Sequence, residues 1–335
     1  MSDPQTLAEC WGVADEPVPP STLTRPNPGV SVVVCAYTEG RWADIRECMT
    51  ALRSQTQPPA EVLLIVDHAE GLLQRARDAF PWVRVLPSRG PRGLSAARNT
   101  GISAARSEII AFVDDDALPA LDWLEHLVEP YEDPDVVAVG GSAAPTWPGE
   151  RPGWFPPEFD WVVGCSYRGL PTRRSEIRNL MGCNMSFRAD VLADDPGFPV
   201  GVGRVGSSRM GCEETELCIR IRQRRAQSRI LFEPRALVTH RVTPNRARWT
   251  YFLARCHAEG VSKALVAKHV GSSDALRLER AYCLRTLPRG IIDGLRAALL
   301  GERDGLAQAG AIIAGLTVTA SSYGVTVLGR AAASR

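Results

Sequence analysis

The stretch Ile109-Ile110-Ala111-Phe112-Val113-Asp114-Asp115-Asp116 is an apolar run that ends on three consecutive carboxylates. A short run of this kind without polar residues predicts a strand buried on both faces of a parallel sheet. Ligands of such sheets bind beyond the carboxyl ends of the strands, where these acids lie. Three adjacent carboxylates repel one another unless a cation compensates them, and oxygen ligands suit Mg²⁺ or Mn²⁺. The stretch therefore predicts a metal and diphosphate site; the alternative is a solvated turn in which one Asp caps a helix over 121–131.

The composition is ordinary for a soluble globular protein. The 335 residues are 44% hydrophobic and 23% charged, enough for one large core or two modest ones. A net charge of +1 provides no global field for nucleic acid or anionic membrane, so phosphate binding must be local. Nine cysteines without a CxxC pair fit a reducing compartment and argue against a zinc ribbon or a disulfide scaffold. Residues 1–16 carry acids and no apolar segment, which is unlike a signal peptide, so a cytoplasmic protein is expected.

Upstream of the acidic stretch, short apolar strands alternate with helical segments. Strands are expected over 30–36, 62–67 and 83–86, and helices over 41–55, 71–80 and 93–106. This rhythm with short links predicts a parallel α/β sheet with right-handed crossovers. Asp67 and Asp114, at the ends of the second and fourth strands, would then share one edge of the sheet.

The composition changes after an expected strand over 136–141. Residues 145–171 are rich in Trp, Pro and Gly, and exposed Trp side chains there would suit a sugar face or would simply pack the loop onto the sheet. Further strands are expected over 184–188, 229–232 and 236–239. A glycine-rich loop over 197–211 could close over a ligand. Its GxGxxG match at 201–206 lacks the strand–turn–helix context of a dinucleotide site, so no nicotinamide cofactor is expected.

A helix expected from 211 to about 225 begins with three glutamates. At helical spacing Glu214 shares the apolar face of the helix, whereas Glu216 pairs outward with Arg220. A carboxylate at the edge of an apolar face has a raised proton affinity and can act as a general base, unless these acids only complement the helix dipole. His240, at a strand end beside arginines, can complete an oxygen-rich metal site or contact a diphosphate, although a lone His is more often structural.

Five motifs, in this order and spacing, resemble those of family 2 inverting glycosyltransferases, which have a nucleotide-sugar-binding GT-A fold. They are Ser31-Val-Val-Val-Cys-Ala-Tyr37, Val66-Asp67, Gly93-Leu-Ser-Ala-Ala-Arg-Asn-Thr-Gly101, Asp114-Asp115-Asp116 and Gly211-Cys-Glu-Glu-Thr-Glu-Leu217. The resemblance implies an α/β fold with a mostly parallel central sheet, flanking helices and a C-terminal helical extension. A narrower similarity, through 154–164 and 184–188, is to a branch that acts on polyprenyl-phosphate-linked sugars.

The resemblance also implies an activity: metal-dependent transfer of a sugar, with inversion, from a nucleoside-diphosphate sugar to an acceptor hydroxyl. UDP is the expected nucleotide, with GDP and dTDP left open, and the acceptor would be a lipid-linked, cell-surface or small-molecule glycan. Tyr37, Asp67, Arg98, Asn99, Asp114 and Asp115 would bind the donor, Asp116 and His240 the Mg²⁺ or Mn²⁺ ion, and Glu214 would be the base. Trp154, Trp161, Asn184 and Glu213 are expected on the acceptor side. Two departures are Cys35-Ala36-Tyr37-Thr38 in place of Pro-Thr-Tyr-Asn, and Glu214 in place of Asp.

The expected organisation has four regions. Residues 1–28 form an irregular lead-in, 29–145 a nucleotide-sugar-binding half, 146–245 an acceptor-binding and catalytic half, and 246–335 a helical region. Helices are expected over 249–268 and 287–300. Residues 305–329 carry no charge and are long enough to span a membrane, but their Gln, Thr and Ser residues favour interfacial contact or a packed helix pair. Peripheral attachment to the cytoplasmic face of the membrane would suit a lipid-linked acceptor.

Two other functions fit parts of the pattern. A haloacid-dehalogenase-type phosphotransferase also begins with a strand ending in Asp-x-Asp, but it needs a Thr soon after, where this chain has Ala117 and Leu118. A non-catalytic sugar-nucleotide-binding module would have no use for an inward-facing Glu214.

Overall fold

The computed structural model describes residues 29–200, 211–271 and 280–333. Its centre is one mixed sheet with strand order β3-β2-β1-β4-β8-β6-β9-β5, and β7 pairs with β9. The strands are β1 (Val30–Ala36), β2 (Glu61–Val66), β3 (Arg84–Pro87), β4 (Ile109–Asp114), β5 (Ala117–Pro119), β6 (Val136–Thr146), β7 (Ser175–Glu176), β8 (Asn184–Arg188) and β9 (Arg229–Arg241).

The four N-terminal strands β1–β4 pair in parallel, as the strand–helix rhythm predicts. From β8 onward the sheet is mixed, because β8 is antiparallel to both β4 and β6, while β6 and β9 are parallel. The central strand β1 lies between β2 and β4, so Asp67 and Asp114 do share one edge of the sheet.

Helices cover both faces of the sheet, which explains why the central strands are apolar on both sides. One core contains Val32 and Val34 of β1 together with α2 (Trp42–Arg53), α3 (Glu70–Ala79) and α5 (Trp123–Val128). The other contains Val33 with α4 (Leu94–Ala104), α6 (Ala189–Ala193) and α7 (Glu213–Arg224). The helix expected over 121–131 is shorter as an α-helix, because a 3₁₀ turn containing Pro130 replaces its last part.

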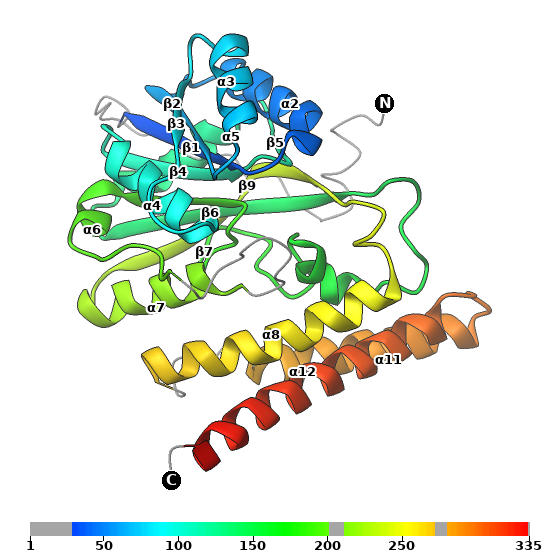
Figure 1. Cartoon of the computed structure of the whole chain (residues 1–335). Helices are drawn as coiled ribbons and strands as arrows, with labels where there is room; N and C mark the ends of the chain where they lie inside the picture. Colours follow the sequence, from blue (N-terminus) through cyan, green and yellow to red (C-terminus); the bar gives the residue numbers. More distant parts are fainter. Residues whose placement is uncertain (1–28, 201–210, 272–279, 334–335) are drawn as a thin grey trace.

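A third cluster joins the aromatic loop to the C-terminal helices. Phe155, Phe159 and Val163 pack on α8 (Trp249–Val270), α11 (Leu287–Leu299) and α12 (Gly305–Ala333). These three helices lie side by side along one side of the α/β unit (Figure 1). The remaining short helices are the 3₁₀ turns Glu39–Arg41 and Pro157–Val163 and a π-helical turn over Tyr282–Thr286.

The prediction of two short strands over 229–232 and 236–239 is wrong, because these residues form one long strand, β9. The expected strand over 136–141 likewise continues to Thr146. The register between β6 and β9 jumps from Gly141↔Glu233 to Ser142↔Leu237, so the extra residues of β9, Pro234 among them, form a bulge. In the sequence Pro234 suggests that the strand ends, but the pairing of β9 with β6 resumes after it.

Asn184 stabilises this bulge. Its Nδ2 donates to the carbonyls of Ser142 and Ala236, both at 2.8 Å, and its Oδ1 accepts from the indole Nε1 of Trp123 at 2.8 Å. The side chain is fully buried. Since backbone groups at a register shift lose their sheet partners, the amide replaces them.

Replacing Asn184 with Ala should lower the free energy of unfolding by about 3 kcal/mol, because it leaves buried polar groups unpaired at a cost of about 1–3 kcal/mol each. Urea denaturation measures this loss. The exposed Asn245→Ala is the matched control and should change stability by less than about 0.5 kcal/mol. Unchanged stability of Asn184→Ala together with a raised KM for the acceptor would instead favour the acceptor-side role expected from sequence.

Candidate active site

The acidic stretch and His240 meet because β5 pairs with β9. Asp114 ends β4, and the turn through Asp115 and Asp116 leads into β5, where Ala117 is opposite His240. The backbone carbonyl of Asp116 accepts the N–H of Arg241 at 2.9 Å, which fixes the turn against the end of β9. Residues far apart in sequence are therefore held at one point by main-chain pairing.

Asp114, Asp116 and His240 form a candidate cation site. One ligand atom from each lies within 4.8 Å of the others. Neither carboxylate oxygen of the buried Asp116 has a hydrogen-bond partner within the described ranges. Two carboxylates and one imidazole whose ligand atoms converge fit Mg²⁺ or Mn²⁺.

The His240 ring is fixed from its other side. Its Nε2 lies 3.3 Å from Oδ1 of Asp116, and its Nδ1 lies 3.7 Å from Sγ of the buried Cys165. Gly164, with φ +88°, packs against the ring: a Cβ there would lie 3.1 Å from Cε1. A fixed ring that directs one nitrogen to the acids is the arrangement expected of a metal-binding histidine.

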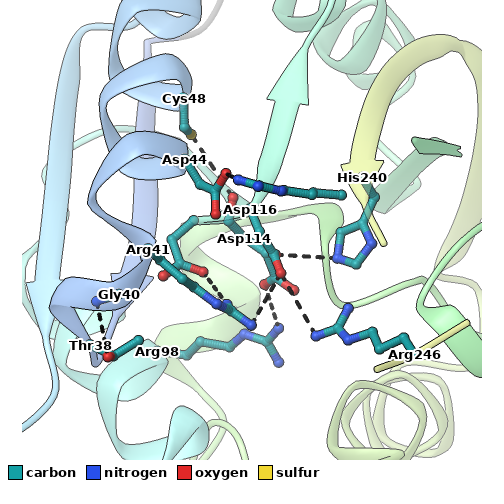
Figure 2. A network of polar contacts seen from close by, with 12 residues as sticks. Thr38, Gly40, Arg41, Asp44, Cys48, Arg98, Asp114, Asp116, His240 and Arg246 are labelled. Carbon is teal, nitrogen blue, oxygen red and sulfur yellow. Dashed lines mark hydrogen bonds and ion pairs between the residues drawn. The ribbon is translucent and has the colours of Figure 1, made fainter. Parts of the chain in front are cut away.

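Two guanidinium groups also face Asp116. Arg41 Nη2 lies 3.2 Å and Arg246 Nη2 3.7 Å from Oδ2. Burial would raise the pKa of Asp116, but His240, Arg41 and Arg246 hold this pKa well below its usual range. Figure 2 shows these side chains directed at the acidic turn from different sides. Asp116 is therefore ionised and surrounded by groups that can also neutralise a diphosphate.

Asp115 contacts the same guanidinium group as Asp116. Its Oδ1 accepts from Nη1 of Arg41 at 2.5 Å, and the side chain is 2% exposed. Burial raises the pKa of Asp115 to about 7, opposed by Arg41 and reinforced by Asp116. Arg41 thus contacts both Asp115 and Asp116, and the donor contact expected of Asp115 from sequence stays a prediction.

Arg98 joins the acidic turn to the start of α7. Its Nη1 donates to Oε1 of Glu213 at 2.9 Å, and its Nη2 lies 2.9 Å from the carbonyl of Gly182 and 3.5 Å from Oδ1 of Asp114. The residue is only 2% exposed. A buried guanidinium that contacts two carboxylates offsets the repulsion between them.

The other predicted donor residues lie around the same edge. Tyr37 is 49% exposed, with the Arg41 guanidinium 5.3 Å from its ring centroid. Asp67 accepts the Gly93 N–H at 2.9 Å and contacts Nδ1 of His68 at 2.6 Å. Asn99 makes two hydrogen bonds to the backbone of Phe198, so its side chain anchors the chain after α6.

A cavity of about 410 Å³ extends from this edge to the C-terminal helices. Its polar end contains Asp114, His240, Arg98, Glu213 and Glu214. Its other end is formed by the aromatic loop and the helices, with Phe159, Trp161, Tyr282, Leu287, Leu316 and Tyr323. Asp114 and His240 of the candidate cation site therefore line the same cavity as Glu214.

Glu214 has the electrostatics of a general base. Burial raises the pKa of Glu214 to about 7, and the neighbouring Glu213 raises it further, while Arg98 opposes the shift. Glu213 itself is paired with Arg98, which leaves Glu214 for the cavity.

Glu216 pairs with Arg220 at 2.9 Å, as expected from sequence. The expectation that Glu216 points outward is wrong, because its residue is only 7% exposed; Arg220 also contacts Asp195.

The structure places only some of the residues expected on the acceptor side at the cavity. Trp161 lines the cavity, and its Nε1 donates to the hydroxyl of Tyr282 at 3.1 Å. Trp154 instead packs among Phe155, Trp249 and Phe252, so it stabilises the loop. Asn184 is buried at the β6–β9 bulge and does not line the cavity. The glycine-rich motif over 201–206 lies outside the described residues.

Sequence reasoning assigned no role to Arg41 or to the charged residues of α8 that line the cavity. Arg41 had a detectable signal: it stands at the N-terminus of α2, where the helix dipole disfavours a cation. A residue in such a position usually has a partner elsewhere, here the acidic turn. Arg246 lies in the arginine-rich stretch after His240, and the sequence predicts a metal or diphosphate contact for His240 but no role for Arg246.

A parallel half-sheet with acids at its strand ends, joined to a mixed half that supplies a carboxylate, is the architecture of GT-A glycosyltransferases. The mannosyltransferase PcManGT from Pyrobaculum calidifontis, solved with GDP-Man and Mn²⁺, matches with a TM-score of 0.54 at 20% identity, over 94% of this chain and 92% of that one. GalNAc-T7, solved with UDP, GalNAc and Mn²⁺, gives 0.51 at 16% identity, over 73% of this chain and 50% of that one. The chain has the GT-A fold.

Sequence comparison gives the family. The model of glycosyl transferase family 2 matches residues 31–195. Glucosyl-dolichyl phosphate glucuronosyltransferase of Haloferax volcanii is 34% identical over 297 residues, which are 87% of this chain and 93% of the relative. The pre-mycofactocin glycosyltransferase of Mycobacterium tuberculosis is 26% identical over 256 residues, 74% of this chain and 51% of the relative. The chain belongs to glycosyltransferase family 2 and is a glycosyltransferase, which removes the phosphotransferase and binding-module alternatives.

We expect UDP together with Mn²⁺ to raise the melting temperature, since a ligand stabilises the state that it binds, and we expect Asp116→Asn to abolish this rise because the candidate cation site loses a charged ligand. Differential scanning fluorimetry, with each variant compared with and without ligand, measures this directly. EDTA should have the same effect on the unaltered protein. The exposed Asp122→Asn is the control and should keep the full shift. An undiminished Mn²⁺-dependent shift in Asp116→Asn would rule out Asp116 as a ligand.

Proposed function

We propose that this enzyme transfers a sugar, with inversion and with the help of Mg²⁺ or Mn²⁺, from a UDP-sugar to a hydroxyl of a lipid-linked acceptor. One observation carries the proposal: Glu214, whose pKa is raised to about 7, faces the same cavity as Asp114 and His240. A base poised near neutral pH beside an acidic cation site is what deprotonation of an alcohol next to a diphosphate leaving group requires.

The proposed donor site uses the edge formed by β1, β2 and β4. Tyr37 and Asp67 bind the base of the nucleotide, and Asp114 lies toward the ribose. Asp116 and His240 hold the cation, which when bound neutralises charge on the departing diphosphate. Arg41 and Arg246, already within 3.7 Å of Asp116, add positive charge at the same point.

In the proposed reaction Glu214 takes the proton of the acceptor hydroxyl. The acceptor oxygen forms a bond to the anomeric carbon as the bond from that carbon to the diphosphate breaks. The nucleoside diphosphate leaves with the electron pair, and the proton remains on the Glu214 carboxylate. A single displacement from the face opposite the leaving group inverts the configuration.

The four regions expected from sequence are retained in this proposal. Residues 29–145 bind the donor, 146–245 carry the base, and 246–335 attach the enzyme to the cytoplasmic face of a membrane. The name of the Haloferax volcanii relative specifies a dolichyl-phosphate-linked acceptor, and lipids of this kind reside in membranes. A C-terminal attachment region would bring the cavity to such an acceptor.

The C-terminal helices support the attachment. Within α12, Gly305–Gly329 has a mean hydropathy of 1.6, with only 22% of its most apolar part buried. Exposed apolar side chains continue onto α11, where Leu299 is 87% exposed and the adjacent Leu300 82%. Exposed arginines at 289, 296 and 303 accompany them. An apolar surface bordered by cations fits the interface of an anionic bilayer. The inner side of α12 packs on α8 and lines the cavity, which favours a helix lying in the interface over one that spans it.

Glu214→Gln should lower kcat by about 10²- to 10⁴-fold, because the amide cannot accept the proton. In the unaltered enzyme, kcat/KM should fall about tenfold per unit below pH 7, since Glu214 must be deprotonated to act and its pKa is about 7. Steady-state transfer rates between pH 5 and 9 measure both effects.

Glu216→Gln is the matched control, because Glu216 lies on the same helix but pairs with Arg220. It should keep the pH profile. A Glu214→Gln variant that transfers sugar at the normal rate, or a flat profile down to pH 5, would exclude Glu214 as the base.

The double variant Leu299→Glu/Leu300→Glu should reduce co-sedimentation with phosphatidylglycerol vesicles at least about tenfold, because two apolar contacts worth about 1.5 kcal/mol or more each are lost. Leu121→Glu, at an exposed leucine of the α/β unit, should bind vesicles normally. Equal sedimentation of all three proteins, or no sedimentation of the unaltered chain, would contradict attachment through α11 and α12.

A further inference from the structure

Helix α8 directs a row of charged side chains into the cavity. Arg255, Glu259 and Lys263 are spaced four residues apart and all line it. Arg255 Nη1 lies 3.0 Å from Oε2 of Glu259, and Lys263 Nζ lies 3.3 Å from Oε1. None of these residues belongs to the proposed donor site, and Glu259 also raises the pKa of Glu214, so the row lies beside the proposed base.

The two cations of the row converge on Glu259. Two cations share one carboxylate, whose Oε1 also accepts from Sγ of Cys212 at 3.4 Å. Arg255 is 7% exposed, and within the described part of the chain its Nε has no hydrogen-bond partner. Burial of a cation whose donors are not all satisfied is costly, and an anion bound in the cavity would remove that cost.

The row lies between the catalytic end of the cavity and the apolar wall of α12. The Arg255 guanidinium packs beside Gly211, just before α7 begins with Glu213 and Glu214: a Cβ on Gly211 would lie 3.2 Å from Nη2. On the other side of the row, Gly260 packs directly on the backbone of α12 at Thr319 and Tyr323. Along the cavity, the lining side chains therefore change from carboxylates to the cations of the row and then to apolar groups.

We propose that Arg255 and Lys263, held in place by Glu259, bind the phosphate of a polyprenyl-phosphate-linked acceptor. The sugar hydroxyl then lies toward Glu214, and the hydrocarbon chain follows the apolar wall that includes Leu287, Leu316 and Ala320. This inference rests on the proposed function and adds to it the recognition of the acceptor. A charge-assisted contact from a guanidinium suits phosphate, and the adjoining apolar wall suits a prenyl chain.

Equilibrium binding tests the inference without depending on transfer. The full chain is titrated with farnesyl phosphate and with farnesol, and the dissociation constants are compared by calorimetry. The unaltered protein should bind farnesyl phosphate at least about tenfold more tightly than farnesol. Arg255→Gln should remove that preference and leave the affinity for farnesol unchanged, and Arg255→Lys should retain part of it.

Two further variants keep the test decisive. Lys263→Gln, at a less buried position of the row, should weaken farnesyl phosphate binding even if Arg255→Gln does not fold. Lys268→Gln, at an exposed position of the same helix, is the control and should bind normally. Glu214→Gln should also keep the preference, so loss of transfer in that variant tests the base while phosphate binding tests the row.

Two results would overturn the inference. One is equal affinity of the unaltered protein for farnesyl phosphate and farnesol. The other is an Arg255→Gln variant that keeps its preference for the phosphate but loses affinity for UDP-glucuronic acid relative to UDP-glucose. The second result would assign the cations to the carboxylate of a donor sugar.

Discussion

The buried guanidinium of Arg98 is the interaction on which the site depends. It lies between Asp114 at the end of β4 and Glu213 at the start of α7, and it also binds the carbonyl of Gly182. The position of Arg98 follows from the packing of α4, because Gly101 lets this helix lie directly on Val33 of β1. Without this cation, two carboxylates from separate parts of the chain would repel each other across the cavity.

Other guanidinium groups also lie between carboxylates around the site. Arg41 lies between Asp115 and Asp116, and Arg246 faces Asp116 from beyond β9. Acids and guanidinium groups therefore alternate, and the surrounding cations hold the pKa of the buried Asp116 below its usual range. Fixed charges of this kind can stabilise a charged leaving group without reorganising during the reaction. Burial raises the pKa values of Asp115 and Glu214 to about 7; of these two residues Glu214 lines the cavity, and it is the one proposed to take a proton from the acceptor.

The sequence predicted the parts of the structure that depend on local pattern. Strands β1, β2 and β4 are continuous apolar runs, so their positions and their shared edge could be predicted. The helical spacing of Glu214 predicted an inward-facing side chain, and this side chain does line the cavity. The β6–β9 bulge could not be predicted from the sequence, because it depends on pairing between distant segments and because Pro234 suggests that the strand ends. Asn184 and Trp154 look like polar or exposed binding groups until tertiary packing gives them partners. Likewise, the period of α8 predicts a helix but does not show that Arg255 and Lys263 face a cavity.

The proposed mechanism is tested most directly by the anomeric configuration of the product. A single displacement by an acceptor hydroxyl deprotonated by Glu214 must invert the anomeric carbon. With a UDP-sugar whose linkage is α, the coupling between the anomeric proton and its neighbour in the NMR spectrum of the purified product should show a β linkage. An α-linked product would contradict a single displacement and would require a second, covalent step for which Glu214 as a base does not account.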